Sequence, residues 1–187
     1  MISTATNRSS IVIDSLQKQF DLFDPALRPK VLWITGECDS MNAISREVLD
    51  SQRPLMLRFP GAMLPGSVMR DVVEFAVGSL GIDTIVVFGH SGSPVMQPEN
   101  DGVWESRIHA LDRGLNLNAD QDDASPGFLG RVTRSQNRLQ AAQAVFVRAV
   151  RELSEIVALT PNSEGKDVAV LPLFYLEESC TVQLYDE

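Results

Sequence analysis

The sequence has few of the residues that build disulfide frameworks or basic binding surfaces. Cys38 and Cys180 are its only cysteines and stand in unrelated contexts, so neither a disulfide framework nor a CxxC zinc ribbon is predicted. Its 16 lysines and arginines are outnumbered by 25 aspartates and glutamates, which gives a net charge of -9. We therefore expect reduced thiols, and we expect neither a nucleic acid nor an anionic membrane surface as a partner.

Long apolar runs are also missing. No window approaches the roughly 20 apolar residues that a bilayer-spanning helix needs. The N-terminal residues lack the basic start and apolar core of a signal peptide, so we expect a soluble, cytoplasmic protein. With 187 residues, of which 44% are hydrophobic and 22% charged, the chain has the composition of a single globular domain, 1–187.

Short continuous apolar runs alternate with amphipathic patterns in the first half of the chain. These patterns predict, in order, a helix over 11–23 within an N-terminal helical arm (1–25), a strand over 30–35, a helix near 42–50, a strand over 53–59, a helix over 67–81 and a strand over 83–90. Three strand–loop–helix units in succession predict a parallel α/β sheet. Ligand sites of such sheets lie beyond the carboxyl ends of the strands.

The second half of the chain begins with a polar, loop-rich excursion over 97–131. The longest helix is predicted over 132–158. Two apolar runs joined by the sequence EES then predict an antiparallel hairpin, and Pro172 indicates an edge position for its first strand. The expected fold is an α/β fold with a central, mostly parallel sheet that ends in an antiparallel edge hairpin and is flanked by helices.

Polar residues follow each of the first three predicted strands. Glu37, Cys38 and Asp39 follow the first strand, residues 58–62 the second and residues 90–93 the third. We expect them to converge at the carboxyl edge of the sheet. Alternation along an extended chain puts Glu37 and Asp39 on one face and directs Cys38 away, so we expect Cys38 to be a buried thiol.

These motifs and their order resemble those of the beta class of carbonic anhydrases over most of the chain. That family carries C-x-D-x-R after its first strand, an R-N-A-G-N-like turn after its second and G-H-[ST]-x-C-G after its third. The resemblance implies the family's fold, in which two cysteines and a histidine bind zinc and an aspartate–arginine dyad lies beside the metal-bound water. It also implies a homodimer or higher homo-oligomer that assembles through the N-terminal helix and the sheet edge.

The first and third motifs keep few of the family's functional residues. Glu37 and Ser93 stand at the two zinc-cysteine positions, and Met41 stands at the position of the dyad arginine. His90 matches the zinc histidine and Asp39 matches the dyad aspartate. The resemblance therefore leaves Asp39 as a candidate catalytic residue without its usual partner.

The second motif keeps the glycine of its turn but lacks the asparagines that are usual in the family. Arg58 and Gly61 match the family, whereas Phe59 and Ala62 stand where asparagines are usual. Arg58 is the second candidate catalytic position. Gly61, together with Ser91 of the third motif, is a candidate for holding a small anion such as bicarbonate near a helix start.

We expect that the loss of two thiolates and the arginine abolishes zinc binding and carbon dioxide hydration. In this interpretation Glu37, Asp39, His90 and Ser93 form a metal-free hydrogen-bonded cluster. Two carboxylates close together repel, so Arg58, another base or a proton must neutralise one of them. The protein is then a pseudoenzyme that binds no cofactor and acts as a binding, regulatory or assembly component.

The alternative is an active metalloenzyme, a carbonate dehydratase or a related lyase or hydrolase. Glu37, Asp39 and His90 offer two carboxylates and one imidazole, a ligand set suited to zinc, manganese or iron. A water bound to such a metal would be acidified and could attack carbon dioxide or another electrophile.

A Ser-His-Asp hydrolase is a weaker interpretation. Ser91 or Ser93 would have to act with His90 and Asp39, but adjacent residues rarely meet at the required geometry, and GHSGS is not a GxSxG elbow. His109, the other histidine, stands in a polar segment and is expected at the surface.

Overall fold

The computed structural model describes residues 4–36, 53–59, 64, 66–93, 128–162 and 165–185. In chain order its elements are α1 (Thr4–Asp21), the 3-10 helix η1 (Pro25–Leu27), β1 (Val31–Thr35), β2 (Leu55–Arg58), α3 (Gly66–Val73), the π-helical segment η3 (Glu74–Ser79), β3 (Thr84–His90), α5 (Phe128–Leu159), β4 (Ala169–Leu176) and β5 (Thr181–Leu184). The predicted helix near 42–50 and residues 97–127 of the polar excursion lie outside the described residues.

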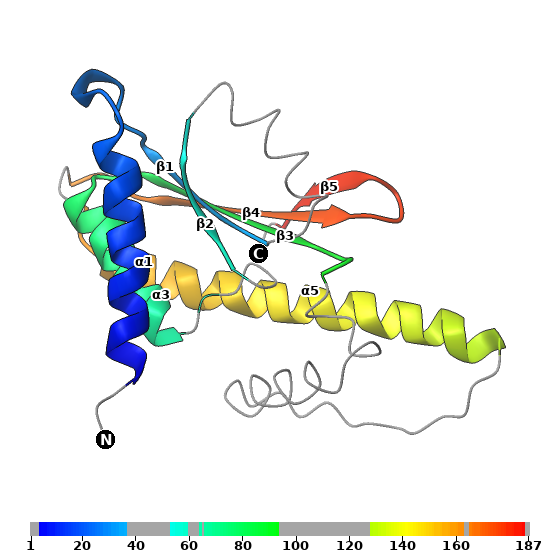
Figure 1. The fold of residues 1–187 in the computed structure, drawn as a ribbon. Coiled ribbons are helices and arrows are strands. Elements are labelled where there is room, and N and C mark those ends of the chain that lie inside the picture. The colour runs from blue at the N-terminus through cyan, green and yellow to red at the C-terminus, as the bar shows by residue number, and fades with distance from the viewer. Residues whose placement is uncertain are drawn as a thin grey trace.

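The described strands form one sheet in the order β2-β1-β3-β4-β5 (Figure 1). Strands β2, β1, β3 and β4 are parallel, and β5 is antiparallel to β4. Strands β1 and β3 lie in the middle of the sheet and are buried along nearly their whole length, which is why their sequences are continuously apolar. The predicted mostly parallel sheet with an antiparallel edge hairpin is confirmed.

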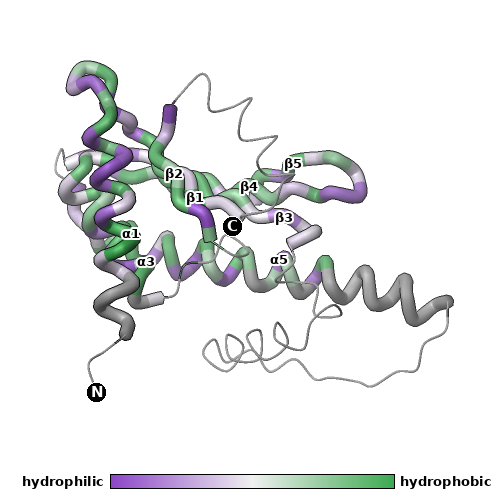
Figure 2. The backbone as a smooth tube through the Cα atoms, viewed as in Figure 1, coloured by the Kyte–Doolittle hydropathy of each residue, from purple (hydrophilic) through white to green (hydrophobic). Residues whose placement is uncertain are grey.

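Helices α1, α3 and α5 pack on one face of this sheet and build the main core with it (Figure 1). Figure 2 shows the strands as mainly apolar, whereas α1 and α5 alternate between apolar and polar residues. A second, smaller cluster consists of Trp33, Val86 and Phe88. These three alternate along their strands with residues of the main core, so they occupy the opposite face of the sheet.

The predicted edge position of the first hairpin strand was wrong, because β4 lies between β3 and β5. Pro172 is tolerated inside the sheet because it lies just beyond the last β4–β5 pair, Leu173 with Leu184. Its carbonyl accepts a hydrogen bond from the Tyr185 N–H at 3.0 Å. The missing N–H of the proline faces the same side, so only the reciprocal bond to Tyr185 is absent, at the end of the β4–β5 ladder, and no bond to β3 is lost.

Two predicted helices begin earlier than expected. Helix α1 begins at Thr4 instead of residue 11, and α5 begins at Phe128, so that residues 128–131 are helical and not part of the excursion. Once a helix is formed, each added residue gains a hydrogen bond without needing an apolar partner, so the polar residues at the start of α1 extend it beyond the apolar stripe. No described helix combines the length and apolar composition needed to cross a bilayer.

The helix predicted over 67–81 changes its hydrogen-bonding pattern midway. Its first part is α3, and its second part is the π-helical segment η3. The N–H of Leu80 donates to the carbonyl of Phe75 at 3.1 Å, the five-residue spacing of a π-helix. Val72, Ala76 and Leu80 of the predicted apolar stripe are buried as expected.

The edge strand β2 is covered by a side chain of α1. The Gln19 amide donates from Nε2 to the Met56 carbonyl and accepts from the Met56 N–H at its Oε1, both at 3.0 Å. This pair of bonds imitates a neighbouring strand at one position. It therefore satisfies backbone groups that would otherwise be open to another strand.

Candidate functional site

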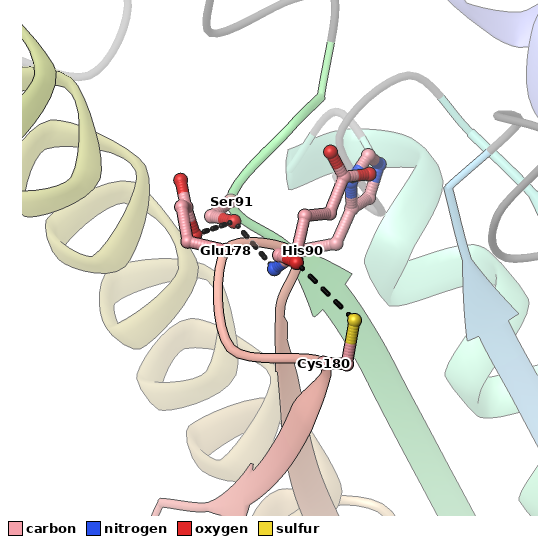
Figure 3. A network of polar contacts seen from close by, with 5 residues as sticks. His90, Ser91, Glu178 and Cys180 are labelled. Carbon is pink, nitrogen blue, oxygen red and sulfur yellow. Dashed lines mark hydrogen bonds and ion pairs between the residues drawn. The ribbon is translucent and has the colours of Figure 1, made fainter.

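The carboxyl end of β3 delivers the polar sequence from His90 to Ser93. Strand β4 runs beside it in parallel, with His90 opposite Tyr175, and the Ser91 N–H donates to the Tyr175 carbonyl at 2.9 Å. Both strands therefore end at the same edge of the sheet. Figure 3 shows His90 and Ser91 together with Glu178 and Cys180, which belong to the turn between β4 and β5.

Gly89 brings the end of β3 close to helix α5. A Cβ atom at this position would lie 2.6 Å from Cδ2 of Phe146 and 3.3 Å from Cδ2 of Phe174. The two rings are buried and pack on each other with centroids 5.1 Å apart. Because Gly89 has no side chain, the rings of Phe146 and Phe174 can pack directly against the end of β3 that carries His90.

His90 is a buried imidazole held by a carboxylate from the hairpin turn. Its side chain is 1% exposed, and its Nδ1 lies 3.2 Å from Oε1 of Glu177, whose side chain is 38% exposed. A carboxylate is an acceptor, so this contact favours a proton on Nδ1. The neutral ring then has its lone pair on Nε2.

Burial also favours the neutral form of this ring. Desolvation lowers the pKa of His90 below its ordinary value of 6.5, and the charge and hydrogen bond of Glu177 offset part of that effect. The same carboxylate thus orients the ring and limits the fall in its pKa.

The hydroxyl of Ser91 bonds to the same turn both as a hydrogen-bond acceptor and as a donor. Its Oγ accepts a hydrogen bond from the Glu177 N–H at 3.0 Å and donates to Oε2 of Glu178 at 2.9 Å. An anion bound at Ser91 would have to compete with the Glu178 carboxylate. The hydroxyl donates to Glu178 instead of His90, so the described contacts do not assemble a serine–histidine pair.

Gly92 leaves room for the carboxylate that meets His90. A Cβ atom built on Gly92 would overlap the side-chain carboxylate of Glu177. That carboxylate is the end of a flexible side chain, so a larger residue would displace it more easily than it would move the backbone. The glycine is therefore a condition for the contact between Glu177 and His90.

Two buried hydroxyls at the sheet edge lack partners among the described residues. Ser93 is 2% exposed and Thr35, the last residue of β1, is fully buried, yet the Oγ of Ser93 and the Oγ1 of Thr35 have no hydrogen-bond partner in that part of the chain. Leaving a buried hydroxyl unsatisfied costs about 1–3 kcal/mol. Ser93 is the residue that the family resemblance puts at a zinc-cysteine position.

The turn between β4 and β5 is held by Cys180. Its backbone is left-handed, with φ of 53°, and its Sγ donates to the Glu177 carbonyl at 3.5 Å. A hydrogen bond to this thiol raises the pKa of Tyr175, with smaller contributions from burial and from the nearby charges. The exposed cysteine therefore has a structural role in the turn that carries the partner of His90.

Several predicted site residues lie outside the described residues: Glu37, Cys38, Asp39 and Gly61. Arg58 is described, at the end of β2, where it pairs in register with Thr35 of β1. Strand β1 separates it from β3, so about 10 Å of sheet lies between their backbones. The predicted role of Arg58 in neutralising a carboxylate stays a prediction.

The sequence interpretation did not include Glu177 in the site. A signal was present, because the EES sequence follows β4 and the carboxyl ends of neighbouring parallel strands share one edge. Recognising it required that β4 be placed beside β3.

The described residues alone do not complete a metal site. Within the described part of the chain, no group of three histidine, cysteine, aspartate or glutamate side chains is placed to hold a metal ion. His90 offers one imidazole, and Glu177 stands behind it on Nδ1, as outer partners of metal-bound histidines do. The neutral hydroxyl of Ser93 is a poor substitute for a thiolate. Completing the site would depend on Glu37 and Asp39.

No protein-family model matches the chain. No curated protein matches it either.

Comparison by structure finds similar folds at low identity. The beta-carbonic anhydrase CafA of the fungal pathogen Aspergillus fumigatus is 16% identical with a TM-score of 0.57, and covers 97% of this chain and 88% of its own. The Coccomyxa beta-carbonic anhydrase, solved with acetazolamide, is 16% identical with a TM-score of 0.54 over 97% of this chain and 84% of its own. A tetrameric beta-carbonic anhydrase of Sordaria macrospora is 15% identical with a TM-score of 0.52 over 98% and 95%. The chain therefore has the fold of the beta-carbonic anhydrases.

Proposed function

We propose that this protein is a beta-carbonic-anhydrase-like pseudoenzyme that binds no zinc and does not hydrate carbon dioxide. It serves as a binding, regulatory or assembly component and needs no cofactor. The observation that carries the proposal is the buried hydroxyl of Ser93 at a position where the family places a zinc thiolate. A neutral hydroxyl neither replaces the charge of a thiolate nor matches its affinity for zinc.

The state of His90 supports the same proposal. Its ring is buried, and its Nδ1 has a protein partner in Glu177. A histidine satisfied in this way is a stable part of a core. It can therefore be retained after the reaction that once required it is lost.

Elemental analysis and a hydration assay test this proposal together. We expect purified wild-type protein and the His90→Ala variant to contain the same substoichiometric amount of zinc, manganese and iron after growth with supplemented metals. We also expect carbon dioxide hydration by both to equal the uncatalysed rate. Stoichiometric metal in the wild type that is lost in His90→Ala, together with measurable hydration, would contradict the proposal.

The alternative function is a metalloenzyme that uses Glu37, Asp39 and His90. It is favoured by one specific observation, the carboxylate of Glu177 on Nδ1, because such a partner raises the basicity of a ligating imidazole. In that case Glu37→Gln and Asp39→Asn should each reduce the metal content measured above. Unchanged metal in both variants would locate the ion elsewhere.

The proposal includes a homo-oligomer and excludes nucleic acid and membrane partners. It is supported by the acidic charge of the chain and by the exposed apolar side chains of the hairpin, Leu171, Val182 and Leu184. Their register with Leu173 and Tyr175 puts them on the sheet face opposite the helices. Apolar side chains in one row on a sheet edge are suited to pairing between copies of a chain.

A further inference from the structure

A small cleft lies between the C-terminal end of α1, η1 and the start of β2. Its volume is about 300 Å³, at the lower end of the range of roughly 300–1,000 Å³ for small-molecule sites. Its apolar walls are formed by Leu22, Phe23, Leu27 and Pro54. Strands β2, β1, β3 and β4 are parallel, so the start of β2 lies at the amino edge of the sheet. His90 stands at the carboxyl edge, and the cleft is therefore separate from the candidate metal site.

Two leucines of the cleft leave most of their surface uncovered. Leu22 is 86% exposed and Leu27 is 68% exposed. Removing apolar surface from water is favourable, so a ligand with an apolar body would gain free energy by covering them. A helix with its side chains is about 10–12 Å in diameter, which exceeds the space of this cleft. The size of the cleft therefore suits a small molecule.

Three polar side chains also line the cleft, and they differ in what they can still bind. Both ends of the Gln19 amide are bonded to the backbone of Met56. The Asp24 carboxylate caps η1 by accepting from the Ala26 N–H at 2.8 Å. Neither a hydrogen bond nor an ion pair joins Arg53 to the described part of the chain. The Arg53 guanidinium is thus the polar group that a ligand can engage.

The backbone of Arg53 has a conformation that few residues adopt. Its φ is 41°, in the left-handed region, although the residue before a proline favours an extended backbone and Pro54 follows it. Such conformations persist where the surrounding structure imposes them, and they cluster at ligand sites. Among the lining residues that the structure describes, the residue held in this way is the one with a positive charge.

We propose that this cleft binds a small monocarboxylate with an apolar body, such as a short aliphatic acid. The apolar walls cover the hydrocarbon part of the ligand. The Arg53 guanidinium donates two parallel hydrogen bonds to the carboxylate, the geometry that this side chain favours. The inference goes beyond the proposed function, since it requires neither metal binding nor carbon dioxide hydration.

Titration of ¹⁵N-labelled protein with hexanoate tests the proposal, at about pH 7, where a carboxyl group is ionised. We expect the amide signals of Leu22, Phe23 and Leu27 to shift and to saturate, which gives both the location and the dissociation constant. Hexan-1-ol has a similar hydrocarbon body without the charge, and hexylammonium carries the opposite charge. We expect both to bind roughly tenfold more weakly than hexanoate, because they lack the charged acceptor for Arg53.

Arg53→Gln and Arg28→Gln form the matched pair. Each removes one positive charge from the same region of the chain. The Arg28 guanidinium, however, lies over the ring of Phe20, 4.7 Å from its centroid, and is not among the described lining residues. We expect Arg53→Gln to weaken hexanoate binding roughly tenfold. Arg28→Gln should change it by less than about twofold, because salt screens a charge that does not touch the ligand.

Asp24→Asn changes the charge of the cleft in the opposite direction. Asparagine also caps helices, so η1 is retained while a negative charge beside the bound carboxylate is removed. We expect hexanoate to bind more tightly to this variant than to the wild type. Three results would overturn the proposal: no saturating shift in the wild type, tighter binding of hexylammonium than of hexanoate, or equal weakening by Arg53→Gln and Arg28→Gln. None of these three comparisons depends on the folding of Asp24→Asn.

Discussion

Gly89 and Gly92 flank His90 and are glycine for two different steric reasons. At Gly89 the space of a side chain is taken by the rings of Phe146 and Phe174, which are part of the core. At Gly92 the space is taken by the carboxylate of Glu177, which is the end of a flexible chain. Gly89 is therefore needed for close packing of the core, and Gly92 is needed for the contact that orients the imidazole of His90.

Gly89→Ala should destabilise the fold. The new methyl group would meet Phe146 at 2.6 and 3.0 Å, and the ring cannot retreat because it also packs against Phe174 and Tyr185. Overpacking of this kind costs about 1–3 kcal/mol. Urea unfolding measures the loss as a lower midpoint.

Gly78→Ala is the control for this substitution. Gly78 lies on the exposed side of η3, and a Cβ atom there would meet nothing within 4 Å. Replacing a helical glycine by alanine gains roughly 0.5–1 kcal/mol. If both variants unfolded at the same urea concentration, the steric role assigned to Gly89 would be wrong.

His90 should make stability depend on pH below neutrality. Burial lowers its folded-state pKa, so as the pH falls below the unfolded value of about 6.5 the unfolded chain gains a proton before the folded chain does. The free energy of unfolding should therefore decrease from about pH 7 downward and level off below the folded-state pKa. Glu177 offsets part of the shift, so Glu177→Gln should extend the decline to lower pH.

The measurement is the difference between the wild type and His90→Gln in unfolding free energy across this range. Carboxylates titrate in both proteins and cancel in the difference. We expect the wild type to lose stability relative to the variant as the pH falls. Two parallel curves would show that His90 contributes no proton linkage.

At the scale of elements, the two edge strands of the sheet, β2 and β5, differ in how they are covered. Strand β2 is capped by the Gln19 side chain at Met56, whereas β5 is exposed along its whole length. The cap contributes two hydrogen bonds across a distance of 37 residues and ties α1 to the sheet. This arrangement makes β2 the protected side and β5 the side open to another chain.

Gln19→Ala should weaken the fold by about 1–3 kcal/mol, since two part-buried hydrogen bonds contribute roughly 0.5–1.5 kcal/mol each. The change is measured by thermal or urea unfolding. Gln17→Ala is the matched control, because Gln17 bonds only the exposed Asp21 one turn away, a contact of about 0.2–0.5 kcal/mol. Similar losses in the two variants would contradict the capping role.

The sequence predicted elements better than it predicted contacts. Continuous apolar runs identified β1 and β3 because strands buried on both faces need apolar residues at every position. Glu177 could not be found in this way, since its role depends on β4 lying beside β3, and strand order is not encoded in local periodicity. Pro172 was misleading for the same reason: it marks the local end of the pairing and not the edge of the sheet.

At the scale of the whole molecule, the exposed apolar side chains of the β4–β5 hairpin lie on the sheet face opposite α1, α3 and α5. The expected apolar face of the N-terminal helix is used within the chain, because Leu16 and Phe20 are buried in the main core while Ile11 is 61% exposed. The exposed apolar row of the β4–β5 hairpin is thus the stronger candidate for contact between copies. Its members Val182 and Leu184 are 48% and 54% exposed.

We expect the protein to sediment as a homo-oligomer, larger than the 20.6 kDa chain. Val182→Lys and Leu184→Lys should shift the distribution toward the monomer, because each places a charge in the proposed contact. Leu159→Lys is the control, since Leu159 is also an exposed apolar residue, 78% exposed, but lies at the end of α5. A monomeric wild type, or dissociation by Leu159→Lys alone, would contradict this assembly.

The separation between His90 and Glu177 has a consequence for synthesis of the chain. At about 5–20 residues per second, a ribosome that has just added His90 needs roughly 4–17 s to add the 87 residues that reach its partner. A nascent chain with β1, β2 and β3 therefore carries an imidazole that Glu177 does not yet orient. The ring acquires its fixed orientation only when the β4–β5 hairpin docks beside β3, so folding of β1, β2 and β3 alone does not fix His90.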